Sequence, residues 1–223
     1  MLKLYHTPLS ANSRRVWVAL LEKEIPFELV SLNMDGDQFQ PEFLAMSPFH
    51  HIPVLVDDGF NVVESLAILD YLEAKYPTPA LLPTDAKALA TVRMVEMVSV
   101  NELLPAITPF ANQMMGMDTD AQQLEQSKQK VLTVLNFFES LLGDDRYFGG
   151  SASLTLAEIV AGTMVPLLPV LGVSLDNHPK LSAWCENLAQ RPAWQKTQPT
   201  QEAIEAFKPR FKELMAARQN QSK

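Results

Sequence analysis

The pattern of hydrophobic and polar positions divides the chain into two parts. In the first part, short apolar runs typical of strands alternate with stretches in which apolar residues recur every three or four positions, as on one face of a helix. The order is strand, helix, strand, an irregular polar segment, a hairpin and a second helix, which predicts an α/β unit with a right-handed crossover. Strands are expected at 2–5, at 27–32, after Pro53 and beyond a turn at 57–59, helices at 13–24 and 65–76, and the irregular segment at 34–49.

Prolines interrupt this pattern shortly after residue 76, and beyond them the apolar residues recur with the spacing of a helix. We therefore predict a domain boundary near residues 77–85. An α/β domain is expected over residues 1–78 and an all-helical domain over residues 86–223. The helix that opens the second domain, residues 86–115, contains two prolines and is expected to kink at both.

A capping box predicts where a central helix of the second domain begins. Thr155 stands three residues before Glu158, so each side chain can bond the backbone N–H of the other residue. This helix is expected to continue through Pro166 and Pro169, with kinks there. Further helices are expected at 124–142, 179–190, 192–196 and 204–217.

Composition argues against several classes of partner. The 223 residues carry 18 basic and 26 acidic side chains, a net charge of −8, without a polybasic run, so nucleic acid and anionic membranes are poor partners. The single cysteine, Cys185, excludes an intramolecular disulfide, and no His or carboxylate spacing suggests a metal site. Without a signal-peptide pattern or a long apolar span, we expect a soluble, cytoplasmic protein.

The segment around Pro53 and Glu64 combines groups that suit a peptide-like ligand. A proline at a strand entrance has no N–H and is a candidate cis peptide that turns the preceding backbone outward. Ile52 can then offer its N–H and C=O to an extended ligand. Glu64 would bind an ammonium group, and Ser65, at a helix N-terminus, a carboxylate. Simple helix capping by Ser65 is the plainer alternative.

The junction of the first strand with the first helix, residues 9–15, holds a second candidate. Arg14 and Arg15 fall in the first turn of the helix, where each opposes the macrodipole at a cost of roughly a few tenths of a kcal/mol. A bound anion nearby would offset that cost. The plain alternative is that Ser10 or Ser13 only caps the helix.

The stretch HHIPVLVDDGF…VVESLAILDYLEAKYP strongly resembles the cytosolic glutathione transferases, and the resemblance extends over essentially the whole chain. It implies an α/β thioredoxin-like N-terminal domain, an all-α C-terminal domain and glutathione as co-substrate. The capping box is typical of the same family, in which Asp is commoner than the Glu158 found here. The loop YHTPLSANSRRVWVALLEK is similar to the cyanobacterial chi class, which has isothiocyanates among its substrates.

The resemblance also implies a catalytic residue. In family members that use a serine, it stands three residues before a small residue and four before an arginine, and Ser10 matches, followed by Ser13 and Arg14. Lowering a thiol pKa from ~8.5 by about two units needs roughly 2.7 kcal/mol of selective thiolate stabilisation. One charge-assisted hydrogen bond, about 1.5–3 kcal/mol, plus a helix N-terminus would supply it. We expect Ser10 to donate to the sulfur anion, with Ser13 and Arg14 as alternatives.

Family resemblance suggests the remaining contacts of glutathione. In insect-type members a histidine two residues before the Ile-Pro pair reaches the glycine carboxylate, which is His50 here, with His51 as runner-up. Because successive strand-entry residues point to opposite sides, only one of them is expected to face the ligand. The expected binding residues are His50, His51, Ile52, Pro53, Glu64, Ser65 and Gln38.

Methionine and aromatic residues crowd the predicted helix over 86–115. Core packing is the default role of such a stripe. By resemblance, however, this helix lines the electrophile pocket above the thiolate, where adaptable apolar side chains suit a range of substrates. The residues expected there are Leu9, Asn101, Leu104, Phe110 and Met114.

These inferences predict a glutathione transferase that joins the glutathione thiolate to isothiocyanates, aryl halides and peroxides, in a detoxifying role. A non-catalytic binding module of the same fold is one alternative, although such modules usually lose the Glu-Ser or Ile-Pro pair. A glutathione-dependent isomerase or dehalogenase is another, although the isomerases carry Ser-Ser-Cys in the first loop. By resemblance a homodimer is expected, with the first helix of the second domain facing the partner's hairpin.

Overall fold

The first domain is built on a four-stranded mixed sheet. The computed structural model describes residues 1–32 and 36–221, so residues 34 and 35 of the predicted irregular segment lie outside the described residues. The strand order is β2-β1-β3-β4, which confirms the predicted strand–helix–strand unit followed by a hairpin. β1 (Leu2–His6) pairs in parallel with β2 (Phe27–Ser31) and antiparallel with β3 (Val54–Asp57), which pairs antiparallel with β4 (Phe60–Val63).

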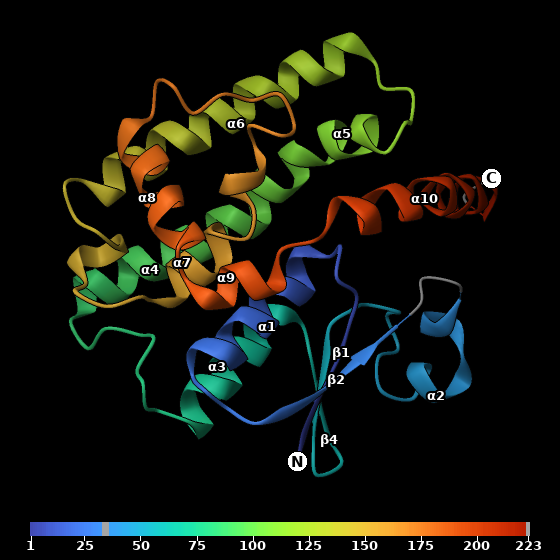
Figure 1. Cartoon of the computed structure of the whole chain (residues 1–223), viewed down its shortest axis with the longest axis horizontal. Coiled ribbons are helices and arrows are strands. Elements are labelled where there is room, and N and C mark those ends of the chain that lie inside the picture. The colour runs from blue at the N-terminus through green and yellow to red at the C-terminus, as the bar shows by residue number, and fades with distance from the viewer. Residues whose placement is uncertain (33–35, 222–223) are drawn as a thin grey trace.

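Helices cover both faces of this sheet. α1 (Ala11–Glu22) and α3 (Ser65–Lys75) contact each other on the face that looks toward the second domain, and α1 also contacts α7 and α9 there (Figure 1). On the other face, the predicted irregular segment contains η1 (Asp37–Phe39) and the short α2 (Pro41–Leu44). Apolar side chains of the sheet and of α1 and α3 are fully buried between these layers, among them Leu4, Leu20, Leu55, Ile68 and Leu69.

The second domain is helical throughout its described elements, which confirms the predicted fold class. Its core is formed by apolar stripes that recur every three or four residues, as on α6, where Val131, Leu135 and Phe138 are fully buried. The residue at which the two domains divide stays a prediction. The elements are α4 (Ala86–Val98), η2 (Ser99–Leu103), α5 (Leu104–Met114), α6 (Ala121–Leu142), η3 (Phe148–Gly150), α7 (Leu156–Ala161), η4 (Val165–Leu167), α8 (Pro179–Ala189), α9 (Pro192–Thr197) and α10 (Gln201–Gln221).

The predicted long helix over residues 86–115 is two helices joined by a turn of π-helix, η2. Pro105 gives the physical reason, because it has no N–H to donate to the carbonyl of Asn101 four residues earlier. The wider π turn accommodates that missing bond. Pro109 lies inside α5, which continues past it to Met114.

The predicted capping box opens α7, where Glu158 accepts the Thr155 backbone N–H at 2.9 Å. The expectation that this helix continues through Pro166 is wrong, because α7 ends before Gly162 and η4 is a separate turn. Pro166 has no N–H for the carbonyl of Gly162, and that carbonyl accepts the indole N–H of Trp194 at 3.1 Å instead.

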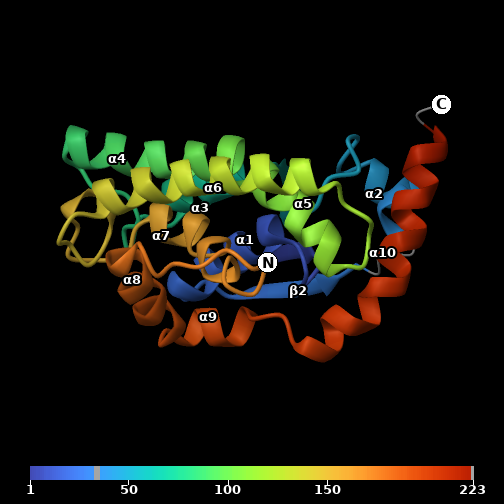
Figure 2. The same cartoon turned by 90° about the horizontal axis from the view of Figure 1, so that it is seen from above.

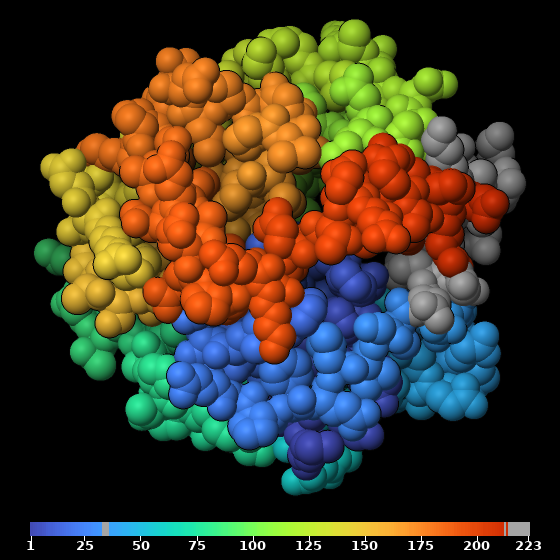
Figure 3. Space-filling model, in the orientation of Figure 1, coloured from blue at the N-terminus to red at the C-terminus, as the bar shows by residue number. Residues whose placement is uncertain are grey.

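α10 follows α9 and runs along the edge of the molecule near α5 (Figures 1 and 2). In the space-filling view its described part spans the boundary between the blue first domain and the green α5 (Figure 3). None of the described helices combines the length and the apolar character needed to cross a membrane.

Candidate active site

Three segments that are distant in the sequence meet at one end of the sheet and enclose a cleft of about 250 Å³. They are the β1–α1 loop, the residues just before β3, and the junction of β4 with α3. The cleft brings together most of the residues that the sequence predicted as ligand contacts. It is lined by Thr7, Ser10, Asn12, His50, His51, Ile52, Pro53, Glu64 and Ser65.

Ser10 is the N-cap of α1 and also faces the cleft. Its backbone is extended, with φ −88° and ψ 119°, and its Oγ accepts the N–H of Ser13 at 3.3 Å. A hydroxyl that accepts this bond still has its own proton to donate. The capping role and a donor role toward a ligand are therefore compatible.

Ser13 and Arg14 do not line the cleft. Ser13 is fully buried, and its Oγ accepts the backbone N–H of Thr7 at 3.3 Å, which ties the loop to the helix. Arg14 is buried too, and its guanidinium donates to Thr197 Oγ1 at 3.2 Å and to Gln198 Oε1 at 2.9 Å. Burial lowers the pKa of Arg14 to about 10, so the group stays charged at neutral pH. Their catalytic roles stay predictions, and these contacts hold Arg14 against α9.

Arg15 lies directly behind the cleft, with no exposed surface. Its Nη1 donates to Ser65 Oγ at 3.4 Å and its Nη2 lies 3.9 Å from Met164 Sδ. Burial lowers the pKa of Arg15 to about 10, although the charge of the nearby Glu96 carboxylate acts in the opposite direction. Burial in turn raises the pKa of Glu96 to about 7, although the Arg93 guanidinium at 2.9 Å opposes that shift. A positive charge thus stands behind Ser65.

Glu64 and Ser65 form the start of α3 in an unusual conformation. Glu64 is the N-cap with φ +66°, a left-handed value that costs a non-glycine residue on the order of 1–3 kcal/mol. The plain alternative, a Ser65 that caps the helix, is wrong, because Ser65 is already the first helical residue and no side-chain hydrogen bond caps α3. The N–H groups of the first turn therefore remain available to an anionic ligand, beside an exposed carboxylate on Glu64.

Both histidines line the cleft, so the expectation that only one of them faces it is wrong. Strand alternation does not apply at these positions, since β3 begins only at Val54 and His50 has φ +58°. The His50 ring packs 5.0 Å from the ring of Phe39, and His51 Nδ1 lies 3.2 Å from Glu64 Oε1. The Ile52–Pro53 peptide is cis, as predicted.

The other predicted contacts do not line this cleft. Gln38 is buried in η1, with 4% of its surface exposed. The predicted electrophile residues lie at the other side of the first loop and on η2 and α5, where Phe110 is buried and Asn101 is exposed. Their roles stay predictions: Gln38, Leu9, Asn101, Leu104, Phe110 and Met114.

Three residues of this region were missed by the sequence analysis. Thr7, in the first loop, and Asn12, in the first turn of α1, line the cleft, and their position close to Ser10 in the sequence was the available signal. Arg15 was noted only for its unfavourable place in the helix. Its contact with Ser65 joins residues 50 positions apart, which local pattern cannot reveal.

Family models match the chain in two parts. Residues 4–80 match the N-terminal domain of glutathione S-transferase, and residues 102–192 match its C-terminal domain. Among curated relatives, glutathione S-transferase 3 of Zea mays is 35% identical over 208 residues, covering 88% of this chain and 92% of the relative. A glutathione S-transferase of Hyoscyamus muticus is 34% identical over 205 residues, covering 87% of this chain and 96% of the relative.

Solved structures agree with this assignment. Glutathione transferase F7 from Populus trichocarpa has a TM-score of 0.78 at 30% identity, covering 88% of this chain and 97% of its own. A glutathione S-transferase-I bound with lactoylglutathione has a TM-score of 0.77 at 30% identity, with the same coverage of 88% and 97%. On sequence, domain order and fold together, the chain belongs to the glutathione S-transferase family.

Proposed function

We propose that this enzyme binds glutathione in the cleft between Ser10 and Glu64 and transfers it to isothiocyanates, aryl halides and peroxides. Family membership supports the enzyme class, a glutathione transferase with glutathione as co-substrate. The residue roles rest on the geometry of the cleft. The observation that carries them is the uncapped N-terminus of α3 beside the exposed Glu64 carboxylate, in the same cleft as Ser10.

Glutathione would lie along the cleft in an extended conformation. Its γ-glutamyl ammonium group pairs with Glu64, and the adjacent carboxylate accepts from the Ser65 N–H and hydroxyl, with the Arg15 charge behind them. The backbone N–H and C=O of Ile52 bond the cysteinyl residue as an added strand would. The glycine carboxylate reaches His50, with His51 as the alternative.

Ser10 would stabilise the thiolate of bound glutathione. The thiol proton leaves to solvent, and the Ser10 O–H donates to the sulfur anion while its oxygen accepts the Ser13 N–H. The sulfur then bonds to the electrophilic carbon, displacing halide from an aryl halide or adding to the central carbon of an isothiocyanate, whose nitrogen takes a proton from solvent. With a peroxide, the sulfur attacks one oxygen and the other leaves as an alcohol. A second glutathione then converts the sulfenic acid into glutathione disulfide and water. The enzyme contributes positioning and a nucleophile that is already ionised.

Large exposed apolar side chains support a homodimer. Phe49 and Phe60, on the hairpin side of the first domain, are 61% and 59% exposed. Met94 and Met97, on α4, are 41% and 44% exposed. Packing α4 of one subunit against the hairpin of the other would bury all four, and light scattering in solution tests this prediction. The single cysteine suits a reducing compartment, and we propose a cytoplasmic enzyme with a detoxifying role.

A conjugation assay tests the proposal. Purified enzyme is mixed with glutathione and, in turn, an aryl halide, an isothiocyanate and an organic peroxide. We expect rates that saturate in glutathione, and a preference for the isothiocyanate would support the resemblance to the chi class. Tight binding of glutathione without turnover of any electrophile would contradict the proposal and favour the non-catalytic module.

A further inference from the structure

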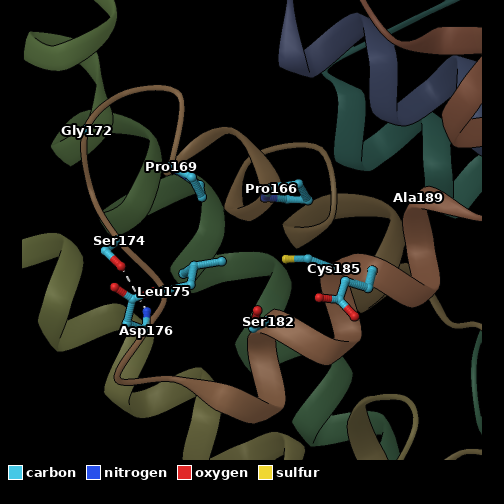
Figure 4. Close-up of a pocket in the computed structure, with 10 residues that line it drawn as sticks. Pro166, Pro169, Gly172, Ser174, Leu175, Asp176, Ser182, Cys185 and Ala189 are labelled. Atoms are coloured by element: carbon cyan, nitrogen blue, oxygen red, sulfur yellow. Dashed lines mark hydrogen bonds between the residues drawn. The ribbon is translucent and has the colours of Figure 1, made fainter.

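A second groove, of about 550 Å³, lies in the helical domain. It runs between α8 and the loop that joins η4 to α8 (Figure 4). No residue of this groove lines the glutathione cleft. It is lined by Pro166, Pro169, Gly172, Ser174, Leu175, Asp176, Ser182, Cys185, Glu186 and Ala189.

One face of α8 forms a wall of the groove. Ser182, Cys185, Glu186 and Ala189 follow one another at spacings of three, one and three residues, so they share one face of the helix. Three of these four side chains are small, which leaves the wall hollow. The opposite face of α8 packs into the core of the domain, where Trp184 is 2% exposed. On the groove face, Cys185 packs partly against the core, whereas Glu186 and Ala189 are exposed.

The facing loop supplies apolar surface. Leu175 is 7% exposed, and its side chain points toward the sulfur of Cys185 (Figure 4). Pro166 and Pro169 extend this surface, and Val170, which follows Pro169 in the chain, is 72% exposed. A large exposed aliphatic residue beside an apolar groove enlarges the surface that an organic molecule can cover.

Both charged side chains that line the groove are acidic. Asp176 and Glu186 are the charged residues among the ten that line it, and the ion pairs of the described residues include neither of them. Burial, with the Glu186 carboxylate nearby, raises the pKa of Cys185 to about 12. The thiol is therefore an uncharged part of the floor at neutral pH.

We propose that this groove binds apolar organic cations, with the hydrophobic body on Leu175 and the two prolines and the positive centre near Asp176 and Glu186. Anions are excluded by the same two carboxylates and by the net charge of −8. Glutathione and its conjugates are anions, so the groove is not a second site for them. The site is independent of the proposed transferase chemistry.

The only thiol of the chain reports on occupancy of the groove. The rate at which uncharged N-ethylmaleimide alkylates Cys185 is measured without glutathione, in the presence of tetraphenylphosphonium or of tetraphenylborate. These two ions match in shape and differ in the sign of charge. At ten times its dissociation constant, tetraphenylphosphonium should slow alkylation by about tenfold, since about nine tenths of the grooves are then filled. Tetraphenylborate should leave the rate unchanged.

Charge-removing variants test the residues involved. The double variant Asp176→Asn/Glu186→Gln should raise the dissociation constant of tetraphenylphosphonium about fivefold, which corresponds to about 1 kcal/mol for the two surface carboxylates together. Glu202→Gln, which removes an exposed carboxylate on α10, is the matched control and should leave protection unchanged. Conjugation activity should be the same in all three proteins.

Three results would overturn this proposal. They are the absence of protection by the cation, equal protection by both ions, and full protection in the double variant. Each can occur while conjugation of glutathione proceeds normally. Failure of the groove and failure of the proposed transferase function are thus distinguishable.

Discussion

Two helix N-termini face the same cleft and are built in opposite ways. α1 has a side-chain cap, since Ser10 accepts the Ser13 N–H, and the nearby Arg14 and Arg15 turn into the protein. α3 has no side-chain cap, and its N-cap residue Glu64 has a left-handed backbone that directs its carboxylate to the surface. The first end presents a hydroxyl proton, and the second presents backbone N–H groups and an acid.

This difference suits the two helix ends to different roles in ligand binding and thiol activation. The cap on α1 takes up one N–H of its first turn, and under our proposal α1 acts on the thiol through the Ser10 hydroxyl. An uncapped end backed by a buried guanidinium is suited to a carboxylate, so under the same proposal α3 binds the amino-acid head of glutathione. In short, α3 should determine affinity, and α1 should determine the reactivity of the thiol.

The largest expected effect is on affinity at α3. Glu64→Gln should weaken glutathione binding by about 2 kcal/mol, roughly 30-fold, because the ligand's ammonium group loses its charged partner. Titration calorimetry measures this change. Glu42→Gln, at an exposed position in α2, is the control and should bind normally. An unchanged affinity in Glu64→Gln would remove this residue from the site.

The next effect should be confined to turnover at α1. Ser10→Ala should lower kcat by about tenfold, with little change in glutathione affinity, because the hydroxyl acts on the thiolate alone. Loss of the cap should also cost about 1 kcal/mol of unfolding free energy. Ser10→Thr keeps the hydroxyl and should retain both properties. A large loss of affinity in Ser10→Ala would contradict the separation of roles.

A smaller effect on affinity is expected at Ser65. Ser65→Ala removes the hydroxyl but keeps the backbone N–H groups of α3, so glutathione affinity should fall by about fivefold, near 1 kcal/mol. The thiol pKa of bound glutathione should not change. A variant whose thiol pKa rises would show that the two helix ends act together.

The smallest effect on the ligand is expected at Arg14. Arg14→Met breaks the hydrogen bonds to Thr197 and Gln198, so the unfolding free energy should fall by about 1–3 kcal/mol. Denaturant unfolding measures that loss. Thiol reactivity should be unaffected once the variant is folded, and a raised thiol pKa would restore Arg14 as a catalytic residue.

Local pattern predicted the parts of this molecule that depend on local chemistry. Strand alternation and the Thr155–Glu158 capping box identified the sheet unit and the start of α7, because both depend on neighbours a few residues apart. Turn and strand chemistry likewise placed Pro53 and Glu64 in one unit, while the family resemblance added Ser10, and all three line one cleft.

The remaining features depend on contacts between distant residues. Arg14 bonds Thr197, 183 positions away, and Arg15 bonds Ser65, so no period within α1 could show that both arginines turn inward. The end of α7 likewise depends on Trp194, which takes the Gly162 carbonyl. His50 has a positive φ, which is uncommon for a residue other than glycine. Strand alternation assumes extended backbone, so it could not predict the direction of this side chain.

The thiolate absorbance of bound glutathione, titrated with pH on the wild type and on Ser10→Ala, tests the central claim most directly. The account predicts a pKa well below that of free glutathione in the wild type, and a return toward the free value in the variant. An equal depression in both proteins would contradict the role of Ser10. The absence of any depression would contradict the ionised-thiol mechanism itself.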